Sequence, residues 1–277
     1  MNPDDALVEQ LAAEVRRGAS YAAISPELVR RLAGQELAKG RSFKEAVKAV
    51  RNKLHQVGGA YQAPPIPYAR LLDELRALPN DPCDPALQAF CRRAMQLHAS
   101  ARERLPIVER FFSETLAEIA PVQSVLDLAC GLNPLALPWM PLAPGAAYYA
   151  CDIYADLVEF VAQFFGHIHQ PGTVEVRDLL GDPPQTCVHL ALALKTIPCL
   201  EQVDKQVGLR LLDALQADDV LVSYPAHSLG GRSKGMVGNY AAAFEAMVAG
   251  RPWSVRRFDF PGELAFLIDK REGRAGL

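Results

Sequence analysis

The residues of this chain that could carry chemistry begin at the end of an apolar segment, Ser124–Leu128. Asp127 lies near the end of that segment, and the small residues Ala129 and Gly131 follow in a turn that lets a ligand approach the backbone. Open α/β sheets bind ligands outside the carboxyl ends of their strands, where such turns lie. The chain contains neither G-x-G-x-x-G nor G-x-x-x-x-G-K-[ST]. We therefore interpret the turn as a nucleoside site, with S-adenosylmethionine as the leading candidate.

Two further acids end the next two predicted strands. Asp152 follows Asp127 by 25 residues, and a carboxylate there can accept both ribose hydroxyls of a nucleoside; the alternative is a cap for the next helix. Asp178 can accept a hydrogen bond from an adenine amine, with Leu179 against the ring; the alternative is a turn acid. Three acids at successive strand ends favour one shared binding site.

Cationic residues flank the same predicted site. Lys195 follows the fourth predicted strand, where it can anchor a phosphate or the target base or simply be a surface lysine, and Leu194 would cover the cofactor. Arg104 is a candidate for the cationic fork that the α-carboxylate of the cofactor would need. His98 lies on the same helical segment, and the alternative for it is a buried histidine that caps a loop.

A glycine-rich basic loop, Ser228–Met236, follows the fifth predicted strand. Its Arg232 and Lys234 are candidates for gripping phosphates and positioning the target, because mobile loops on a rigid scaffold commonly order on substrate; the alternative is a plain flexible loop. Ser223 lacks the G-x-S-x-G context of a hydrolase. The histidines show no metal-ligand spacing, so we expect no metal site.

Helices are predicted for the first part of the chain. An Asn2-Pro3 start, a Ser25-Pro26 start and a capping box of Ser42 and Glu45 each precede apolar residues at helical spacing. The three helices are short and are expected to pack as a bundle. A proline-rich connector with one short helix, Tyr68 to Leu78, and a helical stretch from Pro85 to about Ala120 follow.

The remainder alternates strands with helices such as Asp156–Phe165 and Glu201–Leu215. The expected strands are Ser124–Leu128, Ala147–Ile153, Thr173–Val176, Val188–Leu194, Val220–Tyr224, Ser254–Phe260 and Leu264–Ile268. Alternation predicts a parallel α/β sheet, and the short last connection predicts an antiparallel hairpin. This is the class I, Rossmann-like methyltransferase arrangement. We predict a helical domain with its connector over residues 1–84 and a methyltransferase domain over residues 85–277.

Composition restricts the partners. The net charge is −3, yet eight basic and only two acidic residues lie between Arg30 and Lys53, which indicates an anionic partner such as nucleic acid or a solvated helix face. No apolar run approaches the roughly 18 residues that span a bilayer. The six cysteines form no C-x-x-C pair, which is typical of a reducing, cytoplasmic setting.

With these residues placed, the chain resembles the aminoglycoside-resistance 16S rRNA (guanine(1405)-N(7))-methyltransferase family over nearly its whole length. The matching segments are Arg51–His55 with Gly59–Tyr61, His98–Leu105, Val125–Leu137, Cys151–Ile153, Ser228–Met236 and Asn239-Tyr240. The segments that read ACGLNP and SLGGRSKGM are the most specific.

The resemblance implies a cytoplasmic enzyme that methylates N7 of guanine 1405 in the decoding site of the 30S subunit, with S-adenosylmethionine as donor. It also implies a monomer that has no membrane association and confers aminoglycoside resistance. The implied cofactor-binding residues are Tyr61, His98, Ala99, Ser100, Arg102, Arg104, Ala129, Gly131, Asp152, Ile153, Asp178, Leu179, Leu194 and Gln202. The resemblance also implies that the helical domain of residues 1–84 docks RNA. The RNA-binding candidates are Arg30, Arg31, Lys44, Lys48, Arg51, Lys53, Arg232 and Lys234.

Guanine N7 keeps a free lone pair, so the implied reaction needs no general base and consists of holding N7 in line with the methyl group. The chain departs from relatives in its proline-rich segment 62–85 and in Lys195–Cys199. The rival functions are a methyltransferase for another RNA site or a small molecule, a nicotinamide oxidoreductase without its glycine fingerprint, and a non-catalytic RNA-binding module.

Overall fold

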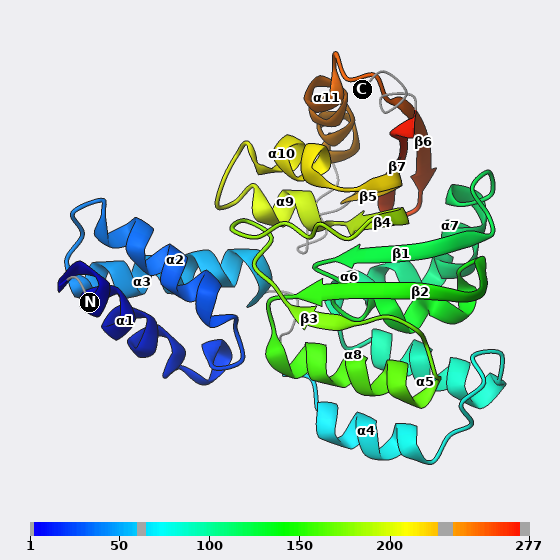
Figure 1. Cartoon of the computed structure of the whole chain (residues 1–277), viewed down its shortest axis with the longest axis horizontal. Helices are drawn as coiled ribbons and strands as arrows, with labels where there is room; N and C mark the ends of the chain where they lie inside the picture. Colours follow the sequence, from blue (N-terminus) through cyan, green and yellow to red (C-terminus); the bar gives the residue numbers. More distant parts are fainter. Residues whose placement is uncertain (1–2, 60–64, 227–234, 272–277) are drawn as a thin grey trace.

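A computed structural model describes residues 3–59, 65–226 and 235–271 of the chain. In this part of the chain a small helical bundle stands beside a seven-stranded sheet covered by helices (Figure 1). The bundle lies beyond the ends toward which β1 (Val122–Leu128) and β2 (Leu142–Asp152) point (Figure 1). Segments that are far apart in the sequence therefore meet at the carboxyl ends of the central strands.

The bundle consists of α1 (Pro3–Arg16), α2 (Pro26–Leu37) and α3 (Phe43–Leu54), as the start signals predict. The Ser25 side chain accepts a hydrogen bond from the Leu28 amide at 3.3 Å, and the capping box of Ser42 and Glu45 is formed. These caps satisfy amides that the first helical turn leaves without partners. A π-helical turn, His55–Gly59, continues α3 toward the sheet.

The described strands follow the order β3-β2-β1-β4-β5-β7-β6, with β1 to β5 parallel and the last two antiparallel. This order confirms the predicted class I methyltransferase fold and its C-terminal hairpin. The bounds of the remaining strands are β3 Val174–Val176, β4 Val188–Leu194, β5 Ala217–Pro225, β6 Ser254–Phe260 and β7 Glu263–Asp269.

Both faces of the sheet are covered, so the central strands are apolar on both sides. On β4, Leu190 and Leu192 face one buried cluster and Ala191 and Ala193 face the other. The first cluster is completed by the bundle, α4 (Tyr68–Arg76), α5 (Pro85–Met95), α7 (Val108–Thr115) and α8 (Ala155–His167). The second is completed by α9 (Thr196–Leu200), α10 (Val207–Ala214) and α11 (Met236–Val248).

Two helical predictions are wrong in detail. The stretch expected from Pro85 to about Ala120 is broken into α5, α6 (Ala99–Arg104), a 3-10 turn and α7. The break at His98 turns α6 toward the carboxyl ends of the strands. The helix expected from Glu201 begins only at Val207, and α9 directly after β4 was missed because its five residues are too few for a periodic pattern.

Main-chain hydrogen bonds join the bundle to the sheet next to the end of β2. The Ser25 amide donates to the Ile153 carbonyl at 2.7 Å, and the Ala155 amide donates to the Ala23 carbonyl at 2.8 Å. No helix among the described residues is long and apolar enough to cross a bilayer. The described His, Cys, Asp and Glu side chains form no group of three that could hold a metal ion.

One buried carboxylate organises the charges of the bundle. The Glu36 side chain is 1% exposed and forms ion pairs at 2.7 Å with Lys39, Arg41 and Lys53. Burial alone would raise the pKa of Glu36, but the lysine partners outweigh it and lower the pKa to about 2. Three of the eight cations of the basic segment are therefore held around one carboxylate within the bundle.

Glu36→Gln should lower the free energy of unfolding by about 1–3 kcal/mol, because charge-assisted hydrogen bonds are lost. Since the pKa of about 2 lies below the ordinary 4.5, this contribution is present above about pH 4.5 and disappears as the pH falls toward 2. Urea denaturation at pH 7 measures the loss of unfolding free energy, and its repetition at pH 3 measures the pH dependence of that loss. Glu9→Gln, which removes a half-exposed partner of Arg30, is the control and should cost less than about 0.5 kcal/mol.

Candidate functional site

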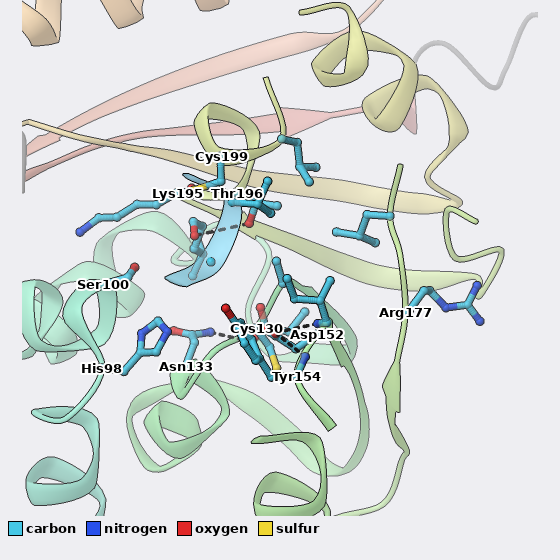
Figure 2. A pocket seen from close by; sticks show the side chains of 18 of the residues that line it. His98, Ser100, Cys130, Asn133, Asp152, Tyr154, Arg177, Lys195, Thr196 and Cys199 are labelled. Atoms are coloured by element: carbon cyan, nitrogen blue, oxygen red, sulfur yellow. Dashed lines mark hydrogen bonds between the residues drawn. The ribbon is translucent and has the colours of Figure 1, made fainter. Parts of the chain in front are cut away.

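A pocket with about 910 Å³ of empty space, its open mouth included, lies at the carboxyl ends of β1, β2 and β4. Figure 2 shows His98, Ser100 and Lys195 toward one end and Arg177 at the opposite end. The bundle contributes Leu28, Val57 and Gly58 to the wall. The pocket therefore lies between the sheet and the bundle.

The turn after β1 takes a backbone shape that brings the main chain close to the pocket. Ala129 has φ 49° and Gly131 has φ 50°, both in the left-handed region. A Cβ on Gly131 would lie 2.7 Å from Cε1 of His98, so only glycine fits there. The missing side chain lets the imidazole rest against the turn.

The Asp152 carboxylate is held by backbone amides that follow β1 and β2. Its Oδ2 accepts from the Gly131 amide at 2.9 Å, and its Oδ1 accepts from the amides of Ile153 and Tyr154 at 2.7 and 3.3 Å. Burial raises its pKa, and these amides partly offset the effect. The carboxylate lines the pocket (Figure 2) with its orientation fixed, as a group that accepts ribose hydroxyls must be.

Asp178 is positioned by the bundle. Arg31 of α2 donates from Nε to its Oδ2 at 2.6 Å and from Nη2 to its Oδ1 at 3.1 Å. The Leu180 amide also donates to Oδ1 at 3.1 Å. Leu179 and Leu194, both buried, add apolar walls. The pocket thus combines a positioned carboxylate with apolar side chains, which suits an adenine ring.

A buried ionic network borders the opposite end. The Arg104 guanidinium pairs with Glu263 through Nη2 at 2.5 Å and donates from Nη1 to Asn133 at 2.9 Å. Lys195 Nζ lies 2.7 Å from Glu103 and 3.4 Å from Glu263. Arg104 thus lines the pocket, but its guanidinium is already paired with the Glu263 carboxylate, whereas the sequence predicted a pair with the α-carboxylate of the cofactor.

Burial and neighbouring charge set the protonation of these groups. Burial raises the pKa of Glu263, but Arg104 and Lys195 overcome that effect and hold it below its usual value. Burial, together with the same two cations, lowers the pKa of His98 to about 4, so the imidazole is neutral at pH 7. Asp127 is hydrogen-bonded to Asn133 and Tyr148 at 2.8 Å each, yet burial raises its pKa to about 7.

Most of the predicted cofactor residues lie at this pocket. Those that line it are His98, Ser100, Arg104, Ala129, Asp152, Ile153, Asp178, Leu179 and Leu194, together with Lys195. Gly131 adjoins it through its amide. Ala99 is buried away from the lining, and Arg102 and Gln202 are exposed outside it. Tyr61, Arg232 and Lys234 lie outside the described residues.

The predicted RNA-binding cations do not form one uniform surface. Arg31, one of these candidates, is paired with Asp178 at the pocket. Arg30 pairs with Glu9 and Glu27. Arg51 donates to the Glu14 carbonyl at 2.7 Å, and Lys53 pairs with Glu36. Lys44 and Lys48 are exposed and form no ion pair with any described residue.

Sequence reasoning missed several residues of the site. These are Leu28, Val57 and Gly58 of the bundle, Asn133, Tyr154 and Arg177 at the pocket, and Glu103 and Glu263 of the ionic network. Only Glu263 carried a signal, because a carboxylate beginning an otherwise apolar strand calls for a buried cationic partner. The bundle residues gave none, since their spacing is that of an ordinary helical core.

Comparisons with known proteins agree with this geometry. The profile of the ribosomal RNA methyltransferase (FmrO) family matches residues 17–267. A 16S rRNA (guanine(1405)-N(7))-methyltransferase of Micromonospora echinospora is 37% identical over 270 residues, which is 97% of this chain and 98% of the relative. An enzyme of the same name from Serratia marcescens is 35% identical over 98% of this chain and 99% of its own length.

Solved structures give the same result. The 16S rRNA methylase RmtB superposes with a TM-score of 0.79 at 28% identity, over 95% of this chain and 98% of its own. The 16S rRNA methyltransferase RmtF in complex with S-adenosyl-L-homocysteine superposes with a TM-score of 0.77 at 33% identity. The match covers 97% of this chain and 99% of the RmtF chain. The similarity therefore includes the bundle as well as the sheet.

The raised pKa of Asp127 predicts a pH dependence of stability. Because its pKa of about 7 in the folded chain exceeds the ordinary 3.8, the folded state binds the proton more tightly and stability falls as the pH rises from about 4 to 7. Asp127→Asn removes this titration, so its free energy of unfolding should rise relative to the unmodified protein across that range. Denaturant titrations between pH 4 and 8 measure the difference. Asp156→Asn, on the exposed start of α8, is the control, and identical profiles for all three proteins would contradict the assignment.

Proposed function

This chain belongs to the ribosomal RNA methyltransferase (FmrO) family, and we propose that it methylates N7 of guanine 1405 in 16S rRNA with S-adenosylmethionine as donor. The observation that carries the proposal is the fixed Asp152 carboxylate beside the Ala129–Gly131 turn, in one pocket with Asp178 and Leu179. These residues offer acceptors for ribose hydroxyls and for an adenine amine.

When bound, S-adenosylmethionine supplies an electrophilic methyl group. Asp152, Asp178, Leu179 and Leu194 would hold its nucleoside, and the His98–Arg104 segment would lie at the opposite end. Guanine N7 needs no deprotonation, and the neutral His98 and the ion-paired Lys195 are therefore suited to positioning and not to proton transfer. The residues of the chain would act by orienting the base and excluding water.

The acceptor is proposed to be the decoding site of the assembled 30S subunit in the cytoplasm, approached by a monomer of this chain. Exposed Lys44 and Lys48 on the bundle, with Arg232 and Lys234 outside the described residues, supply cations for phosphates. A guanine in a folded ribosomal helix has to leave its stack, at a cost of a few kcal/mol. Modification of that guanine would make the host resistant to aminoglycosides. A small-molecule substrate would not require the bundle.

The reaction is tested with tritiated S-adenosylmethionine and purified 30S subunits, followed by chemical cleavage at N7-methylguanine. We expect one modified guanine, at 1405, and little transfer to protein-free 16S rRNA. Transfer to a different nucleotide would reject the target, and failure to bind the cofactor would reject the methyltransferase function as a whole.

The double variant Lys44→Ala/Lys48→Ala tests whether RNA binding by the bundle is separate from cofactor binding in the pocket. We expect kcat/KM for 30S subunits to fall several-fold with a shallower salt dependence, while the affinity for S-adenosylhomocysteine stays unchanged, because phosphate contacts are lost and the pocket is not touched. Asp152→Ala should instead abolish cofactor binding. Arg110→Ala, which removes an exposed, ion-paired cation of α7, is the control. Equal losses in the control and the double variant would show that overall charge, not this face, matters.

A further inference from the structure

The contact between Arg31 and Asp178 joins the bundle to the cofactor pocket. Its two hydrogen bonds, at 2.6 and 3.1 Å, connect residues 147 positions apart in the sequence. The Asp178 side chain is 7% exposed and that of Arg31 is 25% exposed. A bidentate, largely buried pair of this kind fixes the plane of the carboxylate as well as its position.

The surroundings are adapted to this pair. A Cβ on Gly181 would lie 3.2 Å from Oδ2 of Asp178, which is a tight contact, and 3.4 Å from Cδ of Arg31, which is an ordinary one, so glycine makes room for the carboxylate. Among the described residues, the Leu180 amide is the other hydrogen-bond donor to the Asp178 carboxylate. Arg31 therefore dominates its orientation.

The bundle also touches the rest of the pocket close to this pair. Leu28, one turn before Arg31 on α2, is 1% exposed and lines the pocket. The Ser25 amide bonds the carbonyl of Ile153, which directly follows Asp152. Both acids expected to hold the nucleoside are thus flanked by contacts from α2 and the residues that precede it.

We propose that Arg31 is a positioning residue for adenine, through which cofactor binding and the attachment of the helical bundle are coupled. A carboxylate offers about four acceptor sites, so Asp178 can keep both bonds to Arg31 and still accept from an exocyclic amine. Arg31 holds that acceptor in place, and bound cofactor in turn stabilises α2 against the sheet, because coupling between two sites is reciprocal. This inference rests on the proposed function.

The first test is calorimetric binding of S-adenosylhomocysteine to the full chain. Arg31→Met should weaken binding about tenfold, within the usual 5- to 150-fold range of coupling between sites. Arg31→Lys keeps the charge and loses the bidentate guanidinium, so its affinity should lie between those of the unmodified protein and Arg31→Met. Arg30→Met, on the next residue of the same helix with partners Glu9 and Glu27, is the control and should change the affinity less than about twofold.

A second ligand separates positioning from general stability. S-inosylhomocysteine lacks the exocyclic amine, so the unmodified protein should prefer the adenosyl ligand and Arg31→Met should lose most of that preference. In Arg31→Met/Asp178→Asn, binding should be no weaker than in Asp178→Asn alone, because the two residues act as one unit. Hydrogen exchange in α2 should slow when S-adenosylhomocysteine is added to the unmodified protein and not when it is added to Arg31→Met.

The outcomes are distinguishable. If the unmodified protein binds no S-adenosylhomocysteine, the proposed function fails. If it binds and Arg31→Met matches Arg30→Met in affinity and ligand preference, the coupling is overturned while the function stands. Should Arg31→Met not fold, Gly181→Ala disturbs the pair from the other side, and retention of full affinity and preference by Gly181→Ala and Arg31→Lys would overturn the proposal.

Discussion

The hydrogen bonds of the Asp152 carboxylate are the interaction on which the rest of the site depends. One oxygen holds the Gly131 amide of the turn after β1, and the other holds the amides of Ile153 and Tyr154 after β2. The chain around Ile153 then bonds the bundle through main-chain contacts with residues 23–25. One buried carboxylate therefore sets the turn, the strand end and the attachment point of the bundle, and a change in its orientation would move all three together.

The buried carboxylates Glu263 and Asp127, both near the pocket, have pKa values shifted in opposite directions. Glu263 stays ionised although fully buried because Arg104 and Lys195 lie against it. Asp127 has hydrogen bonds to neutral partners only, and burial accordingly raises its pKa to about 7. A buried ion pair of the Arg104–Glu263 type contributes little net stability, since desolvation cancels most of the attraction. Its effect here is geometric: it fixes α6 and the hairpin strand β7 around the end of the pocket where Lys195 lies.

The fold could be predicted from the sequence because its signals are local. Capping residues marked the bundle helices, and alternation with apolar strands marked the sheet, so each of the described strands was predicted. Acids at strand ends were predictable for the same reason, since topology brings such ends together. Arg31, Glu103 and Glu263 could not be predicted in their contacts, because each pairs with a residue far away in the sequence. Local pattern says that a charge needs a partner and does not say which one.

Arg31 shows why this distinction matters for function. Counted with its neighbours it belongs to a basic segment, and a basic segment indicates an anionic partner. In the folded chain the cations of that segment have different surroundings. Some are paired with Glu36 and others are paired on the bundle surface. Arg31 is paired with Asp178 at the pocket, and Lys44 and Lys48 are exposed. The bundle thus faces two ways, with cations toward solvent and Leu28 and Arg31 toward the pocket. Because α2, which carries Leu28 and Arg31, packs against α3, which carries Lys44 and Lys48, the wall of the pocket and the surface proposed to meet RNA belong to one packed unit.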